Sequence, residues 1–230
     1  MSPKGSATAR TRSGQAKSSK SLSSKTLSSK SLPDWQTYSE SEDLPPILFH
    51  SLDAFVANGY HATTVRDVAR RLGQTVPAIY YYYENKQALL MALLSLSIDD
   101  LVSRCERAAA EEPDDPLARF SKIIRCIILY STNRRKFALL DAEIRGLEPG
   151  NRAEYVAKRD KIDAILTAAI NDGIDAGIFA EGDARAVSRA MLAMCRGVAG
   201  WYRSDGRLAP AELGDLYVMY ARRLAGCERP

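Results

Sequence analysis

The sequence has few of the residues from which metal and redox sites are built. It contains only two histidines, His50 and His61. Its four cysteines lie far apart: Cys105, Cys126, Cys195 and Cys227. Metal sites and redox motifs need such residues at short, repeated spacings, so we expect no metal site and no cofactor. Three of the cysteines fall within helical patterns and are expected to be reduced thiols, although a thiol-based redox switch remains open.

Catalytic and membrane-spanning motifs are missing as well. The sequence has no glycine-rich phosphate loop, no G-x-S-x-G motif and no histidine beside a candidate nucleophile. It has no run of about 18 apolar residues that would cross a membrane. No apolar segment follows its basic N-terminal residues, as it would in a secretory signal. We therefore expect a cytoplasmic protein that is not an enzyme and has no membrane partner.

Residues 59–89 carry the most specific local pattern, two short helices joined by a tight turn. At the start of the first helix, Thr64 and Asp67 form a variant of the capping box, in which side chains satisfy free backbone amides. The apolar side chains of this helix recur every three or four residues and share one face: Val65, Val68, Ala69 and Leu72. Gly73 ends the helix, because glycine adopts positive φ at little cost.

The second short helix has the same organisation. Thr75 is its predicted N-cap, and Pro77 is tolerated in its first turn. We expect four residues to form its inward face: Val76, Ile79, Tyr80 and Tyr83. Asn85 then caps a long third helix. Because a two-turn helix is unstable alone, the apolar residues of 47–56 predict a preceding helix, which stops near Gly59 and completes a three-helix head.

At these positions the chain resembles the TetR family of bacterial transcriptional regulators. The matching residues are Gly59-Tyr60, Thr63-Thr64-Val65-Arg66-Asp67-Val68-Ala69, Leu72-Gly73, Ile79-Tyr80-Tyr81-Tyr82-Tyr83 and Asn85-Lys86-Gln87-Ala88-Leu89-Leu90. The resemblance implies an all-α homodimer of about nine helices. It also implies a helix-turn-helix DNA-binding domain over residues 44–92 and a ligand-binding and dimerisation domain over residues 93–230.

DNA contacts are expected from the second short helix and its surroundings. The residues around 74–82 would read the major groove, while Thr64, Arg66, Tyr82 and Lys86 would hold phosphates. The rings of Tyr81 and Tyr82 add apolar contact to thymine methyl groups. The full set of predicted DNA-binding residues is Thr64, Arg66, Gln74, Thr75, Val76, Pro77, Tyr80, Tyr81, Tyr82 and Lys86.

The N-terminal segment contains no acidic residue before position 34 and no aromatic residue before position 35. Its first 30 residues contain seven basic ones: Lys4, Arg10, Arg12, Lys17, Lys20, Lys25 and Lys30. Such a Ser- and Lys-rich segment buries too little apolar surface to offset the entropy of ordering, so we expect residues 1–43 to be a disordered tail. It is either a basic arm that contacts DNA or a solvated segment, including one from a misassigned start codon.

The remainder of the chain reads as helix throughout. Apolar periodicity predicts helices over residues 85–110, 117–131 and 151–175, with a shorter one around residues 137–144 and two more near the C-terminus. No alternating strand pattern occurs. The two last helices have wide apolar faces, which indicate either pairing across a two-fold axis or burial within one subunit. The predicted dimer-interface residues are Met191, Val198, Leu213, Leu216, Tyr217, Tyr220 and Leu224.

Residues 201–210 contain the element W-Y-R-x-x-G-x-L-x-P. This element resembles a subgroup of TetR regulators that includes repressors of lipid and steroid catabolism, some of which respond to acyl-CoA thioesters. The resemblance implies a small hydrophobic or acyl-CoA-type effector. A second interpretation is that Trp201 and Tyr202 only close the helix and pack at the dimer seam.

Polar residues within the otherwise apolar helices are candidates for the ligand pocket, because a buried polar group needs a partner. Arg125 stands out, since isoleucine pairs flank it on both sides. It would meet a ligand anion or, as we favour, pair internally with Glu143 or Asp141. The predicted ligand-binding residues are Arg125, Tyr130, Glu143, Arg145, Tyr155, Arg159, Met194 and Trp201.

Together these patterns predict a dimeric regulator that a small-molecule effector releases from a palindromic double-stranded operator. Effector binding would tilt the long helix that starts at Asn85 and change the separation of the two heads. Repression is the expected sign of regulation, and an activator is the alternative. A DNA-free interaction protein built on the same helical fold also remains open. It would tolerate changes at Gln74, Thr75 and Lys86 without consequence.

Overall fold

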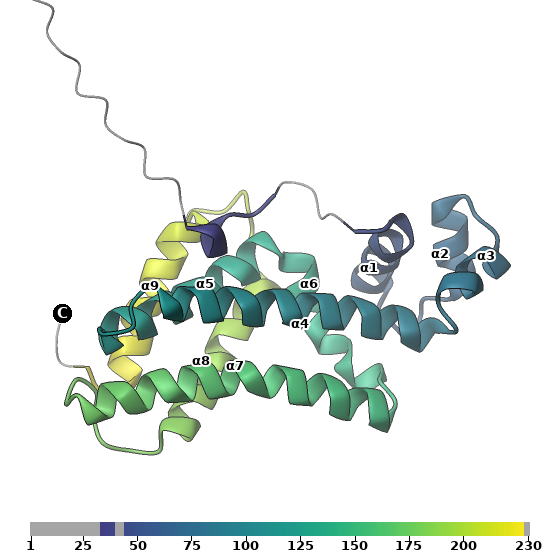
Figure 1. Cartoon of the computed structure of the whole chain (residues 1–230). Helices are drawn as coiled ribbons and strands as arrows, with labels where there is room; N and C mark the ends of the chain where they lie inside the picture. The colour runs from purple at the N-terminus through teal and green to yellow at the C-terminus, as the bar shows by residue number, and fades with distance from the viewer. Residues whose placement is uncertain (1–32, 40–43, 228–230) are drawn as a thin grey trace, which may run out of the picture. The chain divides into compact units, whose positions relative to one another are not determined.

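The computed structural model describes residues 33–39 and 44–227 of the 230-residue chain. The disorder predicted for residues 1–32 and 40–43 therefore lies outside the described residues. Every regular element of the described part is helical, as the sequence predicts (Figure 1). The elements are η1 (Asp34–Gln36), α1 (Pro46–Asn58), α2 (Val65–Leu72), α3 (Val76–Tyr82), α4 (Lys86–Ala110), α5 (Pro116–Asn133), α6 (Arg135–Leu140), η2 (Asp141–Gly146), α7 (Pro149–Asp175), α8 (Ala184–Trp201) and α9 (Pro210–Leu224).

Helices α1 to α3 form the head, and local capping sets their boundaries as predicted. The Thr64 hydroxyl accepts from the Asp67 amide at 3.2 Å, while the Asp67 carboxylate accepts from the Thr64 amide at 3.0 Å. Gly73 ends α2 with φ of 68°. The Thr75 hydroxyl accepts from the Ala78 amide at the start of α3. The side chain of Asn85 caps α4 in the same way, by accepting from the Ala88 amide.

The inward face predicted for the second short helix is wrong at one position. Ile79 is buried and Val76 and Tyr83 are half-buried, but Tyr80 is 48% exposed. Helix α3 has only seven residues and packs mainly against α2. One neighbouring helix covers too narrow a strip to bury four side chains, so the Tyr80 ring lies outside the core.

Helices α4 to α9 form the body, in which α5 is the central helix. It contacts α4, α7, α8 and α9, and its apolar side chains Phe120, Ile123, Ile124 and Ile128 are fully buried. Figure 1 shows α4 and α7 running alongside each other, with α8 and α9 behind them. Helix α4 begins at the head and continues unbroken past residue 92, so any movement of this helix acts on head and body together. None of the helices in the described ranges is long and apolar enough to cross a membrane.

No disulfide joins the cysteines of the described residues. Cys105 of α4 and Cys126 of α5 are buried with their sulfur atoms 3.9 Å apart. The hydrogen bond to Cys126 and burial raise the pKa of the Cys105 thiol well above its usual value. Burial also raises the pKa of the Cys195 thiol to about 12. A protonated, buried thiol is a poor nucleophile, so these cysteines act as apolar packing groups.

One part of the predicted tail is folded. Residues 33–39 lie against the body, where Trp35 of η1 is only 1% exposed. The prediction of a tail extending to residue 43 is therefore wrong over this stretch. The Ser- and Lys-rich composition of the first 30 residues does not extend to Trp35, which buries a large apolar surface and so offsets the cost of ordering its neighbours.

Candidate DNA-reading head and ligand cavity

The outer face of α3 presents an unusual amount of exposed aromatic surface. Tyr81 is 83% exposed and Tyr82 is 68% exposed, and their rings meet edge to face with centroids 5.0 Å apart. Gln74, Thr75 and Pro77 are also exposed. Large aromatic side chains that are exposed next to one another often mark an interaction surface. This face offers hydroxyl groups, an amide and apolar rings, which are the groups that reach phosphates and base edges in a DNA groove.

Arginines surround this face on α2. Arg66 and Arg71 are exposed, whereas Arg70 pairs with Asp67 at 3.2 Å. The Asp67 carboxylate also bonds the Thr64 hydroxyl at 2.6 Å. Hydrogen bonds from the side chain and backbone of Thr64 hold the pKa of the Asp67 carboxyl below its usual value. Arg66 is therefore free to approach a phosphate, while the hydroxyl of Thr64 already serves the helix cap.

Lys86, which the sequence predicts to hold a phosphate, makes several contacts within the head. Its ammonium group donates to the carbonyl oxygens of Tyr60 and Thr63, each at 2.9 Å, and lies 4.2 Å from the centre of the Tyr60 ring. A third carbonyl, that of His61, is 3.5 Å away. Burial lowers the pKa of Lys86. The ammonium thus fastens the turn before α2 to the start of α4, and its donors are occupied. The contacting residues lie more than 20 positions apart in the sequence, so no local sequence pattern predicts this contact.

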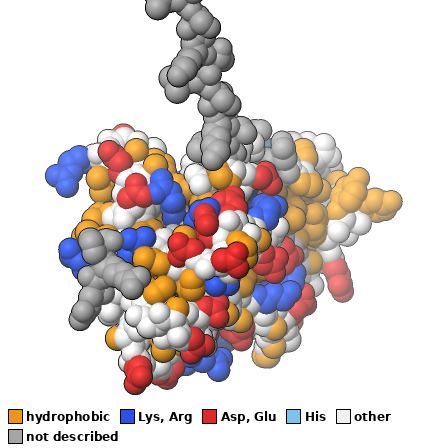
Figure 2. All heavy atoms as spheres, turned by 60° about the vertical axis from the view of Figure 1, so that its left-hand side comes forward, with side chains coloured by type: hydrophobic (Ala, Val, Ile, Leu, Met, Phe, Trp, Pro, Cys, Tyr) orange, Lys and Arg blue, Asp and Glu red, His pale blue; other side chains and the backbone are white. Residues whose placement is uncertain are grey.

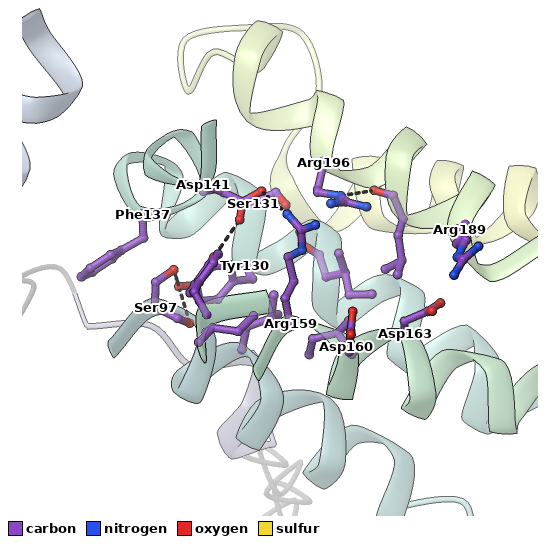
Figure 3. Close-up of a pocket in the computed structure, with 17 residues that line it drawn as sticks. Ser97, Tyr130, Ser131, Phe137, Asp141, Arg159, Asp160, Asp163, Arg189 and Arg196 are labelled. Carbon is purple, nitrogen blue, oxygen red and sulfur yellow. Dashed lines mark hydrogen bonds and ion pairs between the residues drawn. The ribbon is translucent and has the colours of Figure 1, made fainter. Parts of the chain in front are cut away.

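A cavity of about 440 Å³ lies inside the body between α4, α5, α6, η2, α7 and α8 (Figure 3). Its walls combine apolar side chains with serine, tyrosine, aspartate and arginine side chains, so a small molecule in it would meet both kinds of group. The lining residues are Ser97, Ile98, Leu101, Ile127, Tyr130, Ser131, Phe137, Ala138, Asp141, Tyr155, Arg159, Asp160, Ile162, Asp163, Arg189, Leu192 and Arg196.

Asp141 is the centre of one polar group in this cavity. The Tyr155 hydroxyl donates to its carboxylate at 2.7 Å, and the Arg159 guanidinium lies 3.6 Å from its other oxygen. Figure 3 shows Arg159 and Asp141 turned toward each other. Burial raises the pKa of Tyr155, with the nearby Asp141 charge adding to the shift. Tyr155 therefore remains a neutral hydrogen-bond donor across the physiological pH range.

A second polar pair lies where α4 faces α5. The hydroxyl of Tyr130 is 2.8 Å from the Ser97 hydroxyl and donates to the Ser97 carbonyl at 3.0 Å. Burial raises the pKa of Tyr130 as well, so this hydroxyl also stays protonated. Tyr130, Ser97 and Phe137 lie at the opposite end of the cavity from Arg189 in the view of Figure 3.

Helix α8 adds two arginines to the lining of the cavity. Arg189 and Arg196 line it and are exposed to solvent. They are seven residues apart and so share one helix face. Nearby Asp163 is already held by the Ser188 hydroxyl at 2.6 Å and by Arg185 at 3.6 Å. Asp160 lines the cavity as well, so the two arginines of α8 share the lining with carboxylates.

The predicted ligand residues divide into two groups. Tyr130, Tyr155 and Arg159 line the cavity. Five others do not: Arg125, Glu143, Arg145, Met194 and Trp201. The sequence analysis did not include the arginines of α8, although their spacing of seven residues already places them on one helix face. It also missed Ser97, Ser131, Asp160 and Asp163, which no sequence pattern distinguishes from ordinary helix-surface residues.

Arg125 illustrates why those five lie elsewhere. It forms an ion pair with Asp215 of α9, not with Glu143 or Asp141, because its side of α5 faces α9. A Cβ on Gly214 would lie 3.1 Å from the Arg125 side chain, so the arginine passes close to the α9 backbone. Glu143 lies beside Gly59 at the head, and Arg145 is exposed. Met194 is half-buried and Trp201 is 53% exposed.

The predicted dimer-interface residues also divide into two groups. Met191, Val198 and Leu213 are fully buried within the single chain, and Tyr217 is nearly so. Leu216 is half-buried, while Tyr220 and Leu224 are 41% and 47% exposed. Met219 and Trp201 are exposed nearby on α9 and α8. The residues of the first group are thus buried within one subunit. Those of the second group leave apolar surface exposed.

The face of the body shown in Figure 2 carries no large patch of one charge. Acidic and basic side chains alternate over it, with apolar groups between them (Figure 2). This view looks toward the end of the body away from the head. Such a mixed surface gives no long-range attraction for a polyanion. This face of the body therefore offers no basic patch to DNA.

Comparison with known proteins places two family models on the chain. The model described as "Bacterial regulatory proteins, tetR family" matches residues 47–93, and "Tetracyclin repressor-like, C-terminal domain" matches residues 113–225. The transcriptional repressor KstR2 of Mycobacterium tuberculosis is 25% identical over 167 residues, which cover 71% of this chain and 83% of that protein.

Solved structures extend the comparison to the fold. The TetR-family regulator PfmR of Thermus thermophilus superposes with a TM-score of 0.70 at 30% identity, over 80% of this chain and 99% of that one. AibR, crystallised in complex with isovaleryl coenzyme A and operator DNA, superposes with a TM-score of 0.67 at 23% identity, over 76% and 95% of the two chains.

Proposed function

This chain belongs to the TetR family of bacterial transcriptional regulators, and we propose that it is a homodimeric repressor released from a palindromic operator by an amphipathic anion. As a member of that family it is a DNA-binding regulator and not an enzyme. The observation that carries the proposal is the pairing of an exposed aromatic α3 face with a cavity in the body that is lined by apolar side chains and by the arginines Arg159, Arg189 and Arg196. The α3 face serves the operator and the cavity serves the effector.

The α3 face supplies the operator contacts. Tyr81 and Tyr82 are positioned to pack on thymine methyl groups and to donate to phosphates, and Gln74 and Thr75 reach base edges near the helix start. Arg66 holds a phosphate beside them. Tyr80 and Pro77 complete the exposed edge. Lys86 acts indirectly, since it holds the head on α4 and leaves no donor for DNA.

Two heads are needed to read an operator, because one short helix contacts too few base pairs. The uncovered apolar side chains of α8 and α9 support a two-fold interface: Trp201, Met219, Tyr220 and Leu224. Pairing these helices with their copies would bury this surface and set the spacing of the two α3 helices. The buried residues Met191, Val198 and Leu213 would support that surface from inside the subunit.

The effector is proposed to have an apolar body and an anionic head group, as an acyl-CoA thioester does. Arg189 and Arg196 suit the anion, while Ile98, Leu101 and Ile162 suit the acyl part. The cavity of about 440 Å³ holds a short acyl chain or a compact ring system. The AibR structure with isovaleryl coenzyme A supports this class, because it combines the same fold with such a ligand.

The segment η2 provides a path from the cavity to the head. Asp141, its first residue, is held in the cavity by Tyr155. Gly146, its last residue, accepts a hydrogen bond from Gln87 of α4 at 2.6 Å and packs on the Tyr60 ring. An effector that displaces the partners of Asp141 would shift this segment against the start of α4 and so change the separation of the heads.

In vitro selection of random duplexes by the purified protein tests this function. A palindromic consensus, confirmed by an electrophoretic shift, is the expected outcome, and octanoyl-coenzyme A should then release the complex. Arg66→Ala should weaken binding, whereas the matched control Arg207→Ala removes the same charge from the exposed α8–α9 loop and should not. No enrichment at low salt by a folded dimer would overturn the repressor and favour the DNA-free interaction protein. Enrichment with binding strengthened by the effector would favour an activator.

A further inference from the structure

Residues 33–39 form a strap on the body that lies outside the residues matched by either family model. Its single helical turn, η1, contacts α4 and α5. Trp35 is buried there, and its indole nitrogen donates to the Glu111 carboxylate at 2.7 Å. In Figure 1 this purple turn lies beside the end of α4 that is farther from the head. The strap is thus fixed by both apolar burial and a directed hydrogen bond.

Arg104 of α4 binds the backbone of the strap. Its guanidinium donates to the carbonyl oxygens of Trp35 and Thr37 at 3.1 and 3.0 Å, and to the Asp100 carboxylate at 2.9 Å. The same group lies 4.1 Å from the centre of the Tyr38 ring. Arg104 is only 8% exposed, and a buried arginine is stable only when its donors are satisfied. The strap provides two of those acceptors, so α4 is built to receive it.

The strap lies against the same stretch of α4 that forms the cavity wall. Ser97 and Leu101 line the cavity, while Asp100 and Arg104, between and beyond them, hold the strap. A smaller hollow of about 170 Å³ lies on the strap side, and Ser39 at the end of the strap lines it. Tyr130 and Phe137 line both this hollow and the main cavity. These two side chains are therefore a shared wall between the main cavity and the hollow, and Ser39 of the strap lies on the hollow's side of it.

We propose that the strap, residues 33–39, braces this shared wall and opposes effector binding. The cavity has a volume of about 440 Å³. An effector whose apolar end needs more room than this pushes Tyr130 and Phe137 toward the hollow and loosens the strap on α4. The coupling between two binding events is reciprocal. If the effector weakens strap docking by a given factor, removal of the strap increases the affinity for the effector by the same factor. The docking itself is independent of the proposed function, whereas its effect on the effector rests on that function.

Trp35 reports strap docking directly once Trp201, the other of the chain's two tryptophans, is replaced. In a Trp201→Phe background, fluorescence quenching by acrylamide should be weak for the docked Trp35. Arg104→Met should make Trp35 accessible. Arg107→Ala is the matched control, because its ion pair with Asp34 at 3.6 Å joins two solvent-exposed side chains. A Trp35 that is as accessible in the parent protein as in Arg104→Met would overturn the docking.

The linkage is measured with octanoyl-coenzyme A as the probe. Trp35→Ala should lower the concentration that half-releases the operator by about tenfold, and the probe should increase acrylamide quenching of Trp35. Trp35→Phe, which keeps the apolar ring, should stay close to the parent. Thermal unfolding of each variant shows whether the body remains folded. Equal half-release concentrations in all variants would overturn the brace.

A second probe separates this proposal from the choice of effector class. If octanoyl-coenzyme A binds none of the variants, the acyl-CoA assignment fails, and the apolar anion 8-anilinonaphthalene-1-sulfonate replaces it. Its own fluorescence reports cavity binding without DNA. Tighter binding by Trp35→Ala than by the parent and Arg107→Ala supports the brace for any cavity occupant. Equal binding by all three overturns it.

Discussion

Lys86→Met tests whether this lysine builds the head or touches DNA. In the structure its ammonium donates to the carbonyl oxygens of Tyr60 and Thr63, each at 2.9 Å, and lies over the Tyr60 ring. Methionine keeps the apolar stem and removes the charge. The helix packing is therefore preserved, while two charge-assisted hydrogen bonds and a cation–π contact are lost.

The expected size of the effect follows from these contacts. A hydrogen bond to a charged group contributes about 1.5–3 kcal/mol when it is well buried. Lys86 is half-buried, so water replaces part of what is lost, and we expect about 2 kcal/mol for the two bonds together. In a chain of this size such a loss lowers the melting temperature by about 4–8 °C.

Salt dependence separates this scaffold role from a phosphate contact. Each phosphate contact contributes about 0.9 to the slope of log K against log salt concentration. Lys86→Met should therefore lose thermal stability but keep the parent slope, whereas Arg66→Ala should keep its stability and lower the slope by about 0.9. Arg207→Ala controls for the change in net charge. An unchanged melting temperature with a reduced slope in Lys86→Met would refute the scaffold role.

Three further predictions follow from other contacts. Gly146→Ala places a Cβ 2.5 Å from the Tyr60 ring, so urea unfolding should show a loss of about 1–3 kcal/mol, while Gly150→Ala, whose Cβ meets nothing within 4 Å, should not. The pKa of Asp67 is lowered in the fold, so its contribution to stability is present above the unfolded pKa and disappears as the pH falls through the folded one. Asp67→Asn should accordingly flatten the acid limb of the pH–stability curve, and an unaltered limb would contradict this. Leu224→Asp should yield a folded monomer in analytical ultracentrifugation, and a persistent dimer would place the interface elsewhere.

The head was predictable because its signals are local. Capping by Thr64 and Thr75 and the positive φ of Gly73 depend on residues three or four positions away, so the sequence pattern contains the whole interaction. Tyr80 was misplaced because the number of neighbouring helices, which a helical period does not specify, decides how wide a face is buried.

The cavity was only partly predictable because its polar groups depend on which neighbour each helix face meets. Arg125 and Arg159 both interrupt apolar helices, and both have an aspartate partner. Arg125 faces α9 and pairs with Asp215, whereas Arg159 faces η2 and the cavity. Periodicity identifies the inward face of a helix but not the helix that packs against it. The sequence pattern therefore does not distinguish the arginine that pairs with α9 from the arginine that lines the cavity.

The segment that links cavity and head differs from the single short helix that periodicity predicts around residues 137–144. Helix α6 ends at Leu140 and continues as η2, whose 3-10 geometry has poorer hydrogen bonds than an α-helix and none of whose residues is fully buried. Its position is instead fixed at both ends, by Tyr155 on Asp141 and by Gln87 on the carbonyl of Gly146. A segment with little internal stability that is fixed mainly at its two ends rearranges readily when either contact is lost. The weak internal bonding of η2 therefore suits it to the proposed transmission of effector binding to α4.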